Sequence, residues 1–525
     1  MQEGVELTGS FQSAVLDTRA ATMQKHGIAG GLIVLAVLPA LGLLASVGRT
    51  PGFISDSVQY AAAADSLQHG LGLSTPLAPD FDAQFDPNGQ LVARHRLTVW
   101  PPGYPLAIAL ASRFLGLPTA QAALTVNATA LTVMLVFVFL TVRRAANDQV
   151  AAAVTAVTGV LPPIQGVARM ILSEPLFLAA SAVCVFALDS WMRRPERIRY
   201  SWCAALAVGA AMHLRFTGVF LATLHAVVAH LVTRRTKERF PAVASVAAGL
   251  LFGCAFIVYR LIWWGCAACT YRPPSTQTLT DNAVAFALAV LRWLPAVYDF
   301  TVGPLDTALS LMALVLLALY STRSSRSRAL RWPYTTVVPF LFVGIYVLSL
   351  VVTRTLVEFD ALGTRLAVPV SLGLDLIALV WIFARLPQRA GLVAAAGLVV
   401  VFVASGVVSN RRPEWRVLSN RTSADSPIVR YAAGHVREHP DVPIYAREAS
   451  LLSAQVDLQA PIYWLPHHGI PRLRPGEQGV VLLRPPLPAD TAGLLDVDGK
   501  RIVDESELVV WELRGPSGRG ALPSR

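Results

Sequence analysis

The sequence predicts an α-helical membrane protein that crosses the bilayer many times and ends in a small α/β domain. Of its 525 residues, 54% are hydrophobic and only 15% are charged, and the mean hydropathy is +0.53. This composition excludes an ordinary soluble enzyme, because soluble domains are about 25% charged. The net charge of +11 does not indicate a nucleic-acid partner. The basic residues stand in short clusters between apolar runs, which is typical of topology signals in membrane proteins.

Apolar runs long enough to cross about 30 Å of hydrocarbon predict the membrane-spanning helices. The single spans are expected at 28–47, 124–141, 150–165, 171–192, 242–264, 305–320, 334–352, 366–384 and 391–408. The run 202–232 is too long for one simple helix and carries His213 and Arg215 near its centre. We therefore expect two short helices there, turning back at Arg215, and about eleven helices in total.

The loops between these runs predict the orientation of the chain. Every second connection is basic, with clusters at 143–144, 193–199, 234–239, 323–331 and 385–389. Basic loops are retained in the cytoplasm. We therefore expect a multi-pass protein of the cell (inner or plasma) membrane, with a cytoplasmic N-terminal segment 1–27 and an extracytoplasmic C-terminal region.

The composition changes after Val408 and indicates a second domain. Proline, aspartate and glutamate become frequent, a helix is expected at 426–438, and strand-like runs at 443–445, 479–483 and 507–513 alternate with turns. The expected organisation is a transmembrane domain 28–408 with a large first external loop 48–120, an extracytoplasmic α/β domain 409–514 and a disordered tail 515–525.

Asp56 is the strongest candidate for a functional residue, because it follows the first span at the expected external face. A carboxylate at the edge of a bilayer is costly to desolvate, so it indicates a functional site. The segment 54–69 has helical propensity and places Asp56, Gln59 and Tyr60 on neighbouring turns. We expect this helix to lie along the membrane interface as an amphipathic element.

Glu174 is a second candidate, at the start of the span 171–192. Ser173 is expected as its N-cap and Pro175 at a tolerated first-turn position. The alternative interpretation is that Glu174 only complements the helix dipole. The predicted topology gathers several polar residues at the external face, namely Asp56, Arg94, Arg96, Trp100, Glu174, Arg215, Arg272, Asp360 and Arg365.

These residues and their neighbours resemble, in chain order, bacterial GT-C-fold glycosyltransferases. The matching segments are Asp56 with Tyr60, 100–105 (WPPGYP), 173–176 (SEPL), 214–218 (LRFTG), 271–274 (YRPP) and 359–366 (FDALGTRL). The resemblance covers about 28–408 and is to integral-membrane enzymes of the protein O-mannosyltransferase and lipid A aminoarabinose transferase kind. Many relatives carry Asp-Glu in the first loop, whereas here Ser57 follows Asp56, which leaves Asp56 as the candidate base.

The resemblance implies transfer of a hexosyl or pentosyl group from a polyprenyl-phosphate carrier to an acceptor hydroxyl, with inversion, at the external face. The partners are then this lipid-linked sugar donor, a glycan, lipid or protein acceptor and the lipid bilayer. The sequence predicts no metal ligands and no certain cofactor, and it leaves a requirement for a divalent metal open.

The chemistry of the residues agrees with this function. An inverting displacement needs a base for the acceptor proton and a cation for the departing phosphate. The candidate catalytic residues are Asp56 and Glu174, and the candidate substrate-binding residues are Tyr60, Arg215, Arg272, Asp360 and Arg365. Arginine holds phosphate oxygens with two parallel donors. The competing interpretation for each arginine is snorkelling to the headgroups.

A transporter or flippase of a lipid-linked sugar is the alternative function, because it would also have many helices and charged residues near the membrane. Such proteins bind their substrate near the midplane of an internally repeated bundle. Here the ionisable candidates cluster at one face and the sequence has no apparent repeat. A cavity extending from the site towards the cytoplasm would favour the flippase.

Overall fold

The structure is a computed structural model in which part of the chain is described. The described residues are 30–47, 51–52, 55–75, 95–97, 100–264, 275–291, 337–357, 364–411, 427–439, 442, 444–446, 462–464, 478–483, 499–505 and 508–514. The predicted span 305–320 and the tail 515–525 lie outside these residues, as do Arg94, Arg272 and Asp360.

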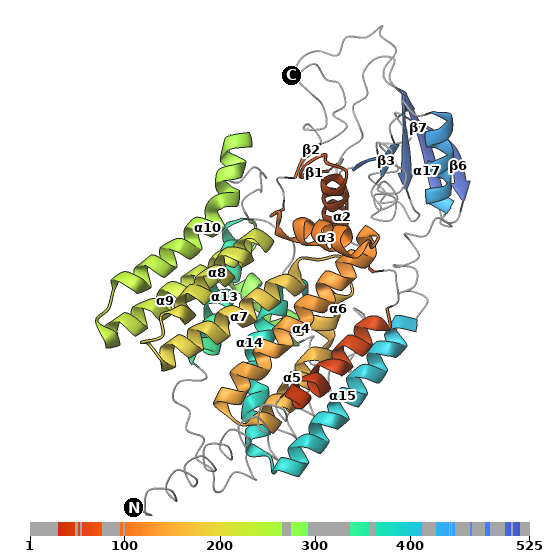
Figure 1. The fold of residues 1–525 in the computed structure, drawn as a ribbon. Helices are drawn as coiled ribbons and strands as arrows, with labels where there is room; N and C mark the ends of the chain where they lie inside the picture. Colours follow the sequence, from red (N-terminus) through yellow and green to blue (C-terminus); the bar gives the residue numbers. More distant parts are fainter. Residues whose placement is uncertain are drawn as a thin grey trace, which may run out of the picture.

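Most of the described chain forms a bundle of long helices (Figure 1). Besides the helix Gly30–Ala45, its helices are α4 (Thr119–Ala145), α5 (Asp148–Val160), α6 (Pro162–Ala168), α7 (Glu174–Arg193), α8 (Arg199–Leu214), α9 (Val219–Thr236), α10 (Phe240–Trp264), α11 (Leu279–Leu291), α13 (Val337–Leu356), α14 (Thr364–Arg385) and α15 (Gln388–Arg411). The central helix is α7, which is largely buried and packs against α4, α8, α9 and α13.

Six helices in the described part of the chain are long and apolar enough to cross a membrane. They are Thr119–Ala145, Glu174–Arg193, Phe216–Thr236, Phe240–Ile262, Val337–Leu356 and Arg365–Arg385, and the bent pair α5 and α6 makes a seventh candidate. The protein is therefore a multi-pass membrane protein. The expected number of about eleven helices is not confirmed by these residues.

The span predicted at 150–165 is not one straight helix, because two helices cover this region. Helices α5 and α6 meet at an angle of 56°. Pro162 and Pro163 start α6; they lack the backbone N–H groups needed to continue α5, and proline is favoured in a first turn. The side-chain amide of Gln165 donates to the carbonyl of Gly159 at the bend, at 2.6 Å, and to the carbonyl of Ala40 in the helix Gly30–Ala45, at 3.2 Å.

The predicted turn at Arg215 is confirmed. Arg215 has extended backbone angles (φ −150°, ψ 145°), which end α8, and the 3-10 turn η2 (Phe216–Gly218) leads into α9. A Cβ atom on Gly218 would lie 2.5 Å from the backbone of Ala211, so glycine allows the two helices to approach closely. The second helix is long enough to span the membrane, contrary to the expectation of two short helices.

Helix α2 (Ser55–Gln68) forms where a helix was predicted, but it is not an amphipathic interface helix. Asp56, Ser57 and Ser66 are buried along with Tyr60 and the alanines 61–64. Polar and apolar side chains are therefore not separated onto a solvent-exposed face and a buried face. The small alanines let α3 (Gly103–Leu115) and α4 pack against α2 and cover it.

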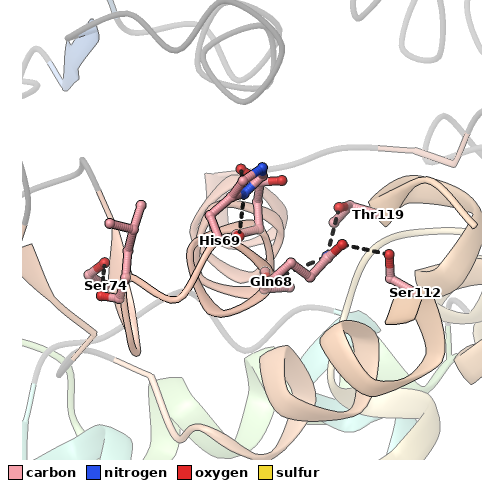
Figure 2. Close-up of polar contacts among 8 residues, drawn as sticks. Gln68, His69, Ser74, Ser112 and Thr119 are labelled. Carbon is pink, nitrogen blue, oxygen red and sulfur yellow. Dashed lines mark hydrogen bonds and ion pairs between the residues drawn. The ribbon is translucent and has the colours of Figure 1, made fainter. Parts of the chain in front are cut away.

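The C-terminal end of α2 is fastened to the bundle by hydrogen bonds (Figure 2). The amide of Gln68 donates to Thr119 Oγ1 at 3.2 Å, and its oxygen accepts from Ser112 Oγ at 2.7 Å. Ser112 lies near the end of α3 and Thr119 begins α4. These bonds fix α2 against two helices and so restrict where Asp56, at its other end, can lie.

Two sheets lie beyond the end of the bundle where α2 and α3 are found (Figure 1). The first pairs β1 (Ser74–Thr75) with β2 (His95–Arg96). The second has the strand order β4-β3-β5-β7-β6, and helix α17 (Pro427–Glu438) lies beside it (Figure 1). Its strands are β3 (Ile444–Ala446), β4 (Ile462–Trp464), β5 (Gln478–Leu483), β6 (Gly499–Glu505) and β7 (Leu508–Arg514).

This second sheet is mixed, because β3 pairs in parallel with β4 and β5, and β7 pairs antiparallel with β5 and β6. The predicted helix and the strands near 443, 479 and 507 are present, whereas β4 and β6 were not predicted. The assignment of 409–514 to a separate extracytoplasmic domain stays a prediction.

Candidate active site

Four charged side chains from separate parts of the chain meet at one end of the bundle, and we call Asp56, Glu174, Arg215 and Arg365 the charge cluster. The guanidinium of Arg365 forms ion pairs with both Asp56 and Glu174. Arg215 Nη1 lies 2.6 Å from Glu174 Oε1. Two carboxylates therefore face two guanidiniums, and the cluster is neutral when all four are ionised.

Each member of the charge cluster lies at or just before the start of a helical segment. Asp56 is in the first turn of α2, Glu174 begins α7 and Arg365 is the second residue of α14. Arg215 directly precedes η2. Helix starts favour carboxylates through their free N–H groups, whereas arginine gains nothing from the dipole there. The two arginines are therefore held by the carboxylates.

The charge cluster and the basic loops lie at opposite ends of the bundle. Helices α7 and α14 begin at the cluster and end at Arg193 and Arg385. The helical segment that follows Arg215 ends at the pair Arg234 and Arg235. The arginines that predicted a cytoplasmic side are thus one helix length away from the cluster.

Burial differs sharply within the charge cluster. The exposed fraction of the side chain is 1% for Glu174 and 10% for Arg215, but 24% for Arg365. Buried charges require ionic partners, and Glu174 supplies one to each arginine. Burial raises the pKa of the Asp56 carboxyl above its ordinary value, and the neighbouring Arg365 opposes this rise. Arg365 is the most accessible member of the cluster.

Tyr60 lies beside the charge cluster and is fully buried. Its hydroxyl and Ser173 Oγ are hydrogen-bonded at 3.1 Å. Its ring meets the ring of Tyr104 edge-on, with centroids 5.2 Å apart, and lies 6.0 Å from the ring of Trp100. Burial raises the pKa of Tyr60, so the phenol stays protonated at neutral pH.

The expected capping role of Ser173 is wrong. Ser173 occupies the N-cap position of α7, but its side chain makes no capping bond and pairs with Tyr60 instead. Its backbone is helical (φ −75°, ψ −12°), whereas a capping residue normally has extended angles. Pro175 stands in the first turn as expected. Tyr60 therefore connects α2 to the residue beside Glu174.

The segments 100–105 and 214–218, distant in sequence, meet next to the charge cluster. A Cβ atom on Gly103 would lie 2.6 Å from the carbonyl oxygen of His213. The start of α3 thus presses against the end of α8, just before Arg215. A larger residue than glycine would push these two segments apart.

Asn127 was not singled out from the sequence, although it supports this region. It is fully buried in α4. It accepts a hydrogen bond from the Tyr104 hydroxyl at 3.0 Å and donates to the carbonyl of Met170 at 2.7 Å. The sequence did contain a signal for this residue, namely an asparagine within an apolar span. Polar groups in such spans need partners inside the protein.

Other predicted site residues are not brought to the cluster by the described structure. Arg272 and Asp360, expected to bind substrate, lie outside the described residues. Arg96 is exposed in β2. In the part of the chain that the structure describes, no three His, Cys, Asp or Glu side chains gather as metal ligands would.

Comparison with solved structures identifies the fold. The chain is similar to ArnT from Cupriavidus metallidurans bound to undecaprenyl phosphate, with a TM-score of 0.59, 14% identity, and coverage of 93% of this chain and 99% of that chain. It is also similar to the apo state of the same protein, with a TM-score of 0.51, 14% identity, and coverage of 93% and 100%. No protein-family profile matches the sequence, and no curated protein sequence does.

The protein therefore has the GT-C fold, which is that of integral-membrane glycosyltransferases. This confirms the fold expected from the resemblance of the sequence. At this identity the likeness defines the fold, and the chemistry has to be argued from the charge cluster.

Proposed function

We propose that the protein is an inverting glycosyltransferase that moves a sugar from a polyprenyl-phosphate carrier to an acceptor hydroxyl. The observation that carries this proposal is the link from Arg365 to both Asp56 and Glu174 within the charge cluster. One carboxylate and one accessible guanidinium stand side by side there, as an inverting displacement requires. The similar ArnT structure contains undecaprenyl phosphate, which supports a lipid phosphate as the carrier.

Asp56 is the proposed base. Its carboxylate takes the proton of the acceptor hydroxyl while that oxygen forms a bond to the anomeric carbon of the donor sugar. The bond from the anomeric carbon to the carrier oxygen breaks, and the lipid phosphate leaves with the bonding electrons. General-base catalysis of this kind contributes about 10² to 10⁴ in rate.

Arg365 is the proposed phosphate ligand. It is the most accessible of the four charged residues, and its guanidinium can hold two phosphate oxygens at once. This guanidinium forms an ion pair with Asp56. A phosphate that takes over these donors leaves the Asp56 carboxylate free to accept a proton. Donor binding and activation of the base are then coupled through one side chain.

Glu174 is better suited to holding the arginines than to proton transfer. It is almost completely buried and contacts both Arg215 and Arg365. A carboxylate between two guanidiniums is strongly stabilised in its charged form and is a weak base. This favours Asp56 over Glu174 as the base. Arg215 is proposed as a further group that faces the phosphate.

The proposed site faces the extracytoplasmic side. This orientation rests on the basic helix ends, which lie opposite the charge cluster and would be cytoplasmic. The N-terminus would then be cytoplasmic, and the region 409–514 would form an extracytoplasmic α/β domain. Arg272 and Asp360 are proposed as further substrate-binding residues, and about eleven helices as the full number.

The first experiment compares sugar transfer by the purified protein and its Asp56→Asn variant, using a panel of polyprenyl-phosphate sugars. We expect turnover to fall by about 10² to 10⁴ in the variant, while binding of the lipid donor is retained. The matched control is Asp65→Asn on the same helix, which removes a carboxylate paired with His69 away from the cluster. Equal turnover in wild type and Asp56→Asn would exclude Asp56 as the base.

The flippase remains the alternative function, and the same preparation tests it. A cavity of about 570 Å³ lies at the basic end of the bundle, which is the end opposite the charge cluster. It is lined by residues such as Arg143, Asp148 and Phe383, and by no member of the charge cluster. This cavity therefore does not reach the charge cluster. Movement of a labelled lipid-linked sugar across proteoliposomes, without turnover of any donor, would establish the flippase instead.

A further inference from the structure

A basic cavity lies at the end of the bundle opposite the charge cluster, and nothing in the proposed reaction uses it. Its volume is about 240 Å³, and we call it the arginine cavity. It is lined by Arg144, Ser190, Arg193, Arg194 and Tyr200. These residues come from the end of α4, the end of α7 and the start of α8, so the cavity is formed where three helices meet.

Arg144 is held in place at the arginine cavity by uncharged contacts. Its guanidinium donates a hydrogen bond to the buried hydroxyl of Ser190. Its central carbon lies 4.0 Å from the centroid of the Phe186 ring, a distance suited to a cation–π contact. A fixed guanidinium loses little further freedom when it binds an anion.

The arginine cavity has an excess of positive charge. Arg193 Nε is paired with Oδ2 of the buried Asp189 at 2.9 Å. Among the described residues, Arg144 and Arg194 form no ion pair with a carboxylate. Two guanidiniums therefore remain available to an anion, next to the hydroxyls of Ser190 and Tyr200.

The position of the arginine cavity along the helices corresponds to the membrane surface. Helices α4 and α7 are both candidate spans, and they end at Ala145 and Arg193. The ends of such spans lie at the level of the lipid headgroups. Arg144 and Arg194 are exposed, so a headgroup in the surrounding leaflet can reach them.

We propose that the arginine cavity binds the phosphate of an anionic phospholipid from the bilayer. The guanidiniums of Arg144 and Arg194 contact the phosphate oxygens, and the hydroxyl of Tyr200 supplies a further donor. Such a lipid would join α4, α7 and α8 at one point. This inference does not depend on the proposed transferase activity.

The test measures binding of phosphatidylglycerol to the full-length protein in nanodiscs or by native mass spectrometry, with phosphatidylcholine as the neutral reference. Arg144→Gln combined with Arg194→Gln should weaken phosphatidylglycerol binding about 30-fold, since each arginine near the surface contributes about a fivefold attraction. Arg194→Gln alone, which changes an exposed side chain, should weaken it about fivefold and keeps the proposal testable if the double variant is unstable.

The matched control is Arg234→Gln combined with Arg239→Gln. It removes two exposed arginines at the basic end that do not line the cavity. An equal loss in this control, or unchanged binding in the Arg144 and Arg194 variants, would overturn the proposal. Inorganic phosphate should not displace the lipid at millimolar concentration. If it does, the cavity is a site for free phosphate and the lipid assignment is wrong.

Discussion

Glu174 and Arg365, which are 191 positions apart in the chain, form an ion pair that joins the first turns of α7 and α14. The same guanidinium reaches Asp56 on α2. The starts of three helices are therefore connected through one side chain. In the proposed reaction, the residues that hold these helices together also bind the phosphate and free the base, so folding and chemistry depend on the same contacts.

Glu174→Gln should destabilise the fold strongly. The variant leaves Arg215, which is 9% exposed, without its carboxylate partner. Removing one partner of a buried pair costs about 3 to 5 kcal/mol, so the midpoint of thermal unfolding in detergent should fall clearly. Asp148→Asn breaks the partly exposed pair with Arg143 and should cost no more than about 1 kcal/mol. Equal shifts in the two variants would contradict the structural role of Glu174.

The pH dependence of turnover should reflect the protonation of the Asp56 carboxylate. Burial raises the pKa of this carboxyl above its ordinary value of 3.8. A base acts in its deprotonated form, so kcat/KM should fall as the pH is lowered through this raised pKa, with the acidic limb above pH 3.8. A profile measured from about pH 4 to about pH 8 with wild type and Asp56→Glu locates the limb. A limb that Asp56→Glu leaves unmoved would belong to another group.

Tyr60→Phe should slow turnover several-fold while it lowers the stability of the fold only slightly. The substitution removes the hydrogen bond to Ser173, beside Glu174, at a cost of about 1 kcal/mol in the free energy of unfolding. Tyr104→Phe is the matched control, because it removes the hydrogen bond to Asn127 and should cost a similar amount. We expect several-fold slower transfer only in Tyr60→Phe. Unfolding midpoints and turnover measured side by side separate the two effects, and equal losses of turnover would assign Tyr60 a packing role.

Gly103→Ala should disturb the position of Arg215. The added Cβ would lie 2.6 Å from the carbonyl oxygen of His213, so α3 or the end of α8 must shift. We expect a higher KM for the lipid donor together with a lower unfolding temperature. Gly42→Ala is the control, since nothing lies within 4 Å of its added Cβ. A donor KM equal to that of wild type would show that the contact does not position Arg215.

The sequence predicted much of the fold because the information is local. Runs of apolar residues marked most of the described spans, and the polar interruption at Arg215 marked the turn between α8 and α9. The bend at Pro162 was missed although proline was visible, because the apolar run continues through it. The burial of α2 was also missed. Its alanines are compatible with either a solvent-exposed or a buried face. Only the packing of α3 and α4 against the helix decides between the two.

The amino-acid sequence by itself determined that the chain is a membrane protein, where most of its helices run and which types of residue were candidates for chemistry. Apolar length and the cost of buried charge act on each segment separately. The tertiary structure decided that Arg365 contacts both Asp56 and Glu174, and that Ser173 bonds to Tyr60 and does not cap α7. These partners lie on different helices, and ion pairs and hydrogen bonds act over a few ångströms. Helix packing therefore selects them, and no spacing along the chain encodes that choice.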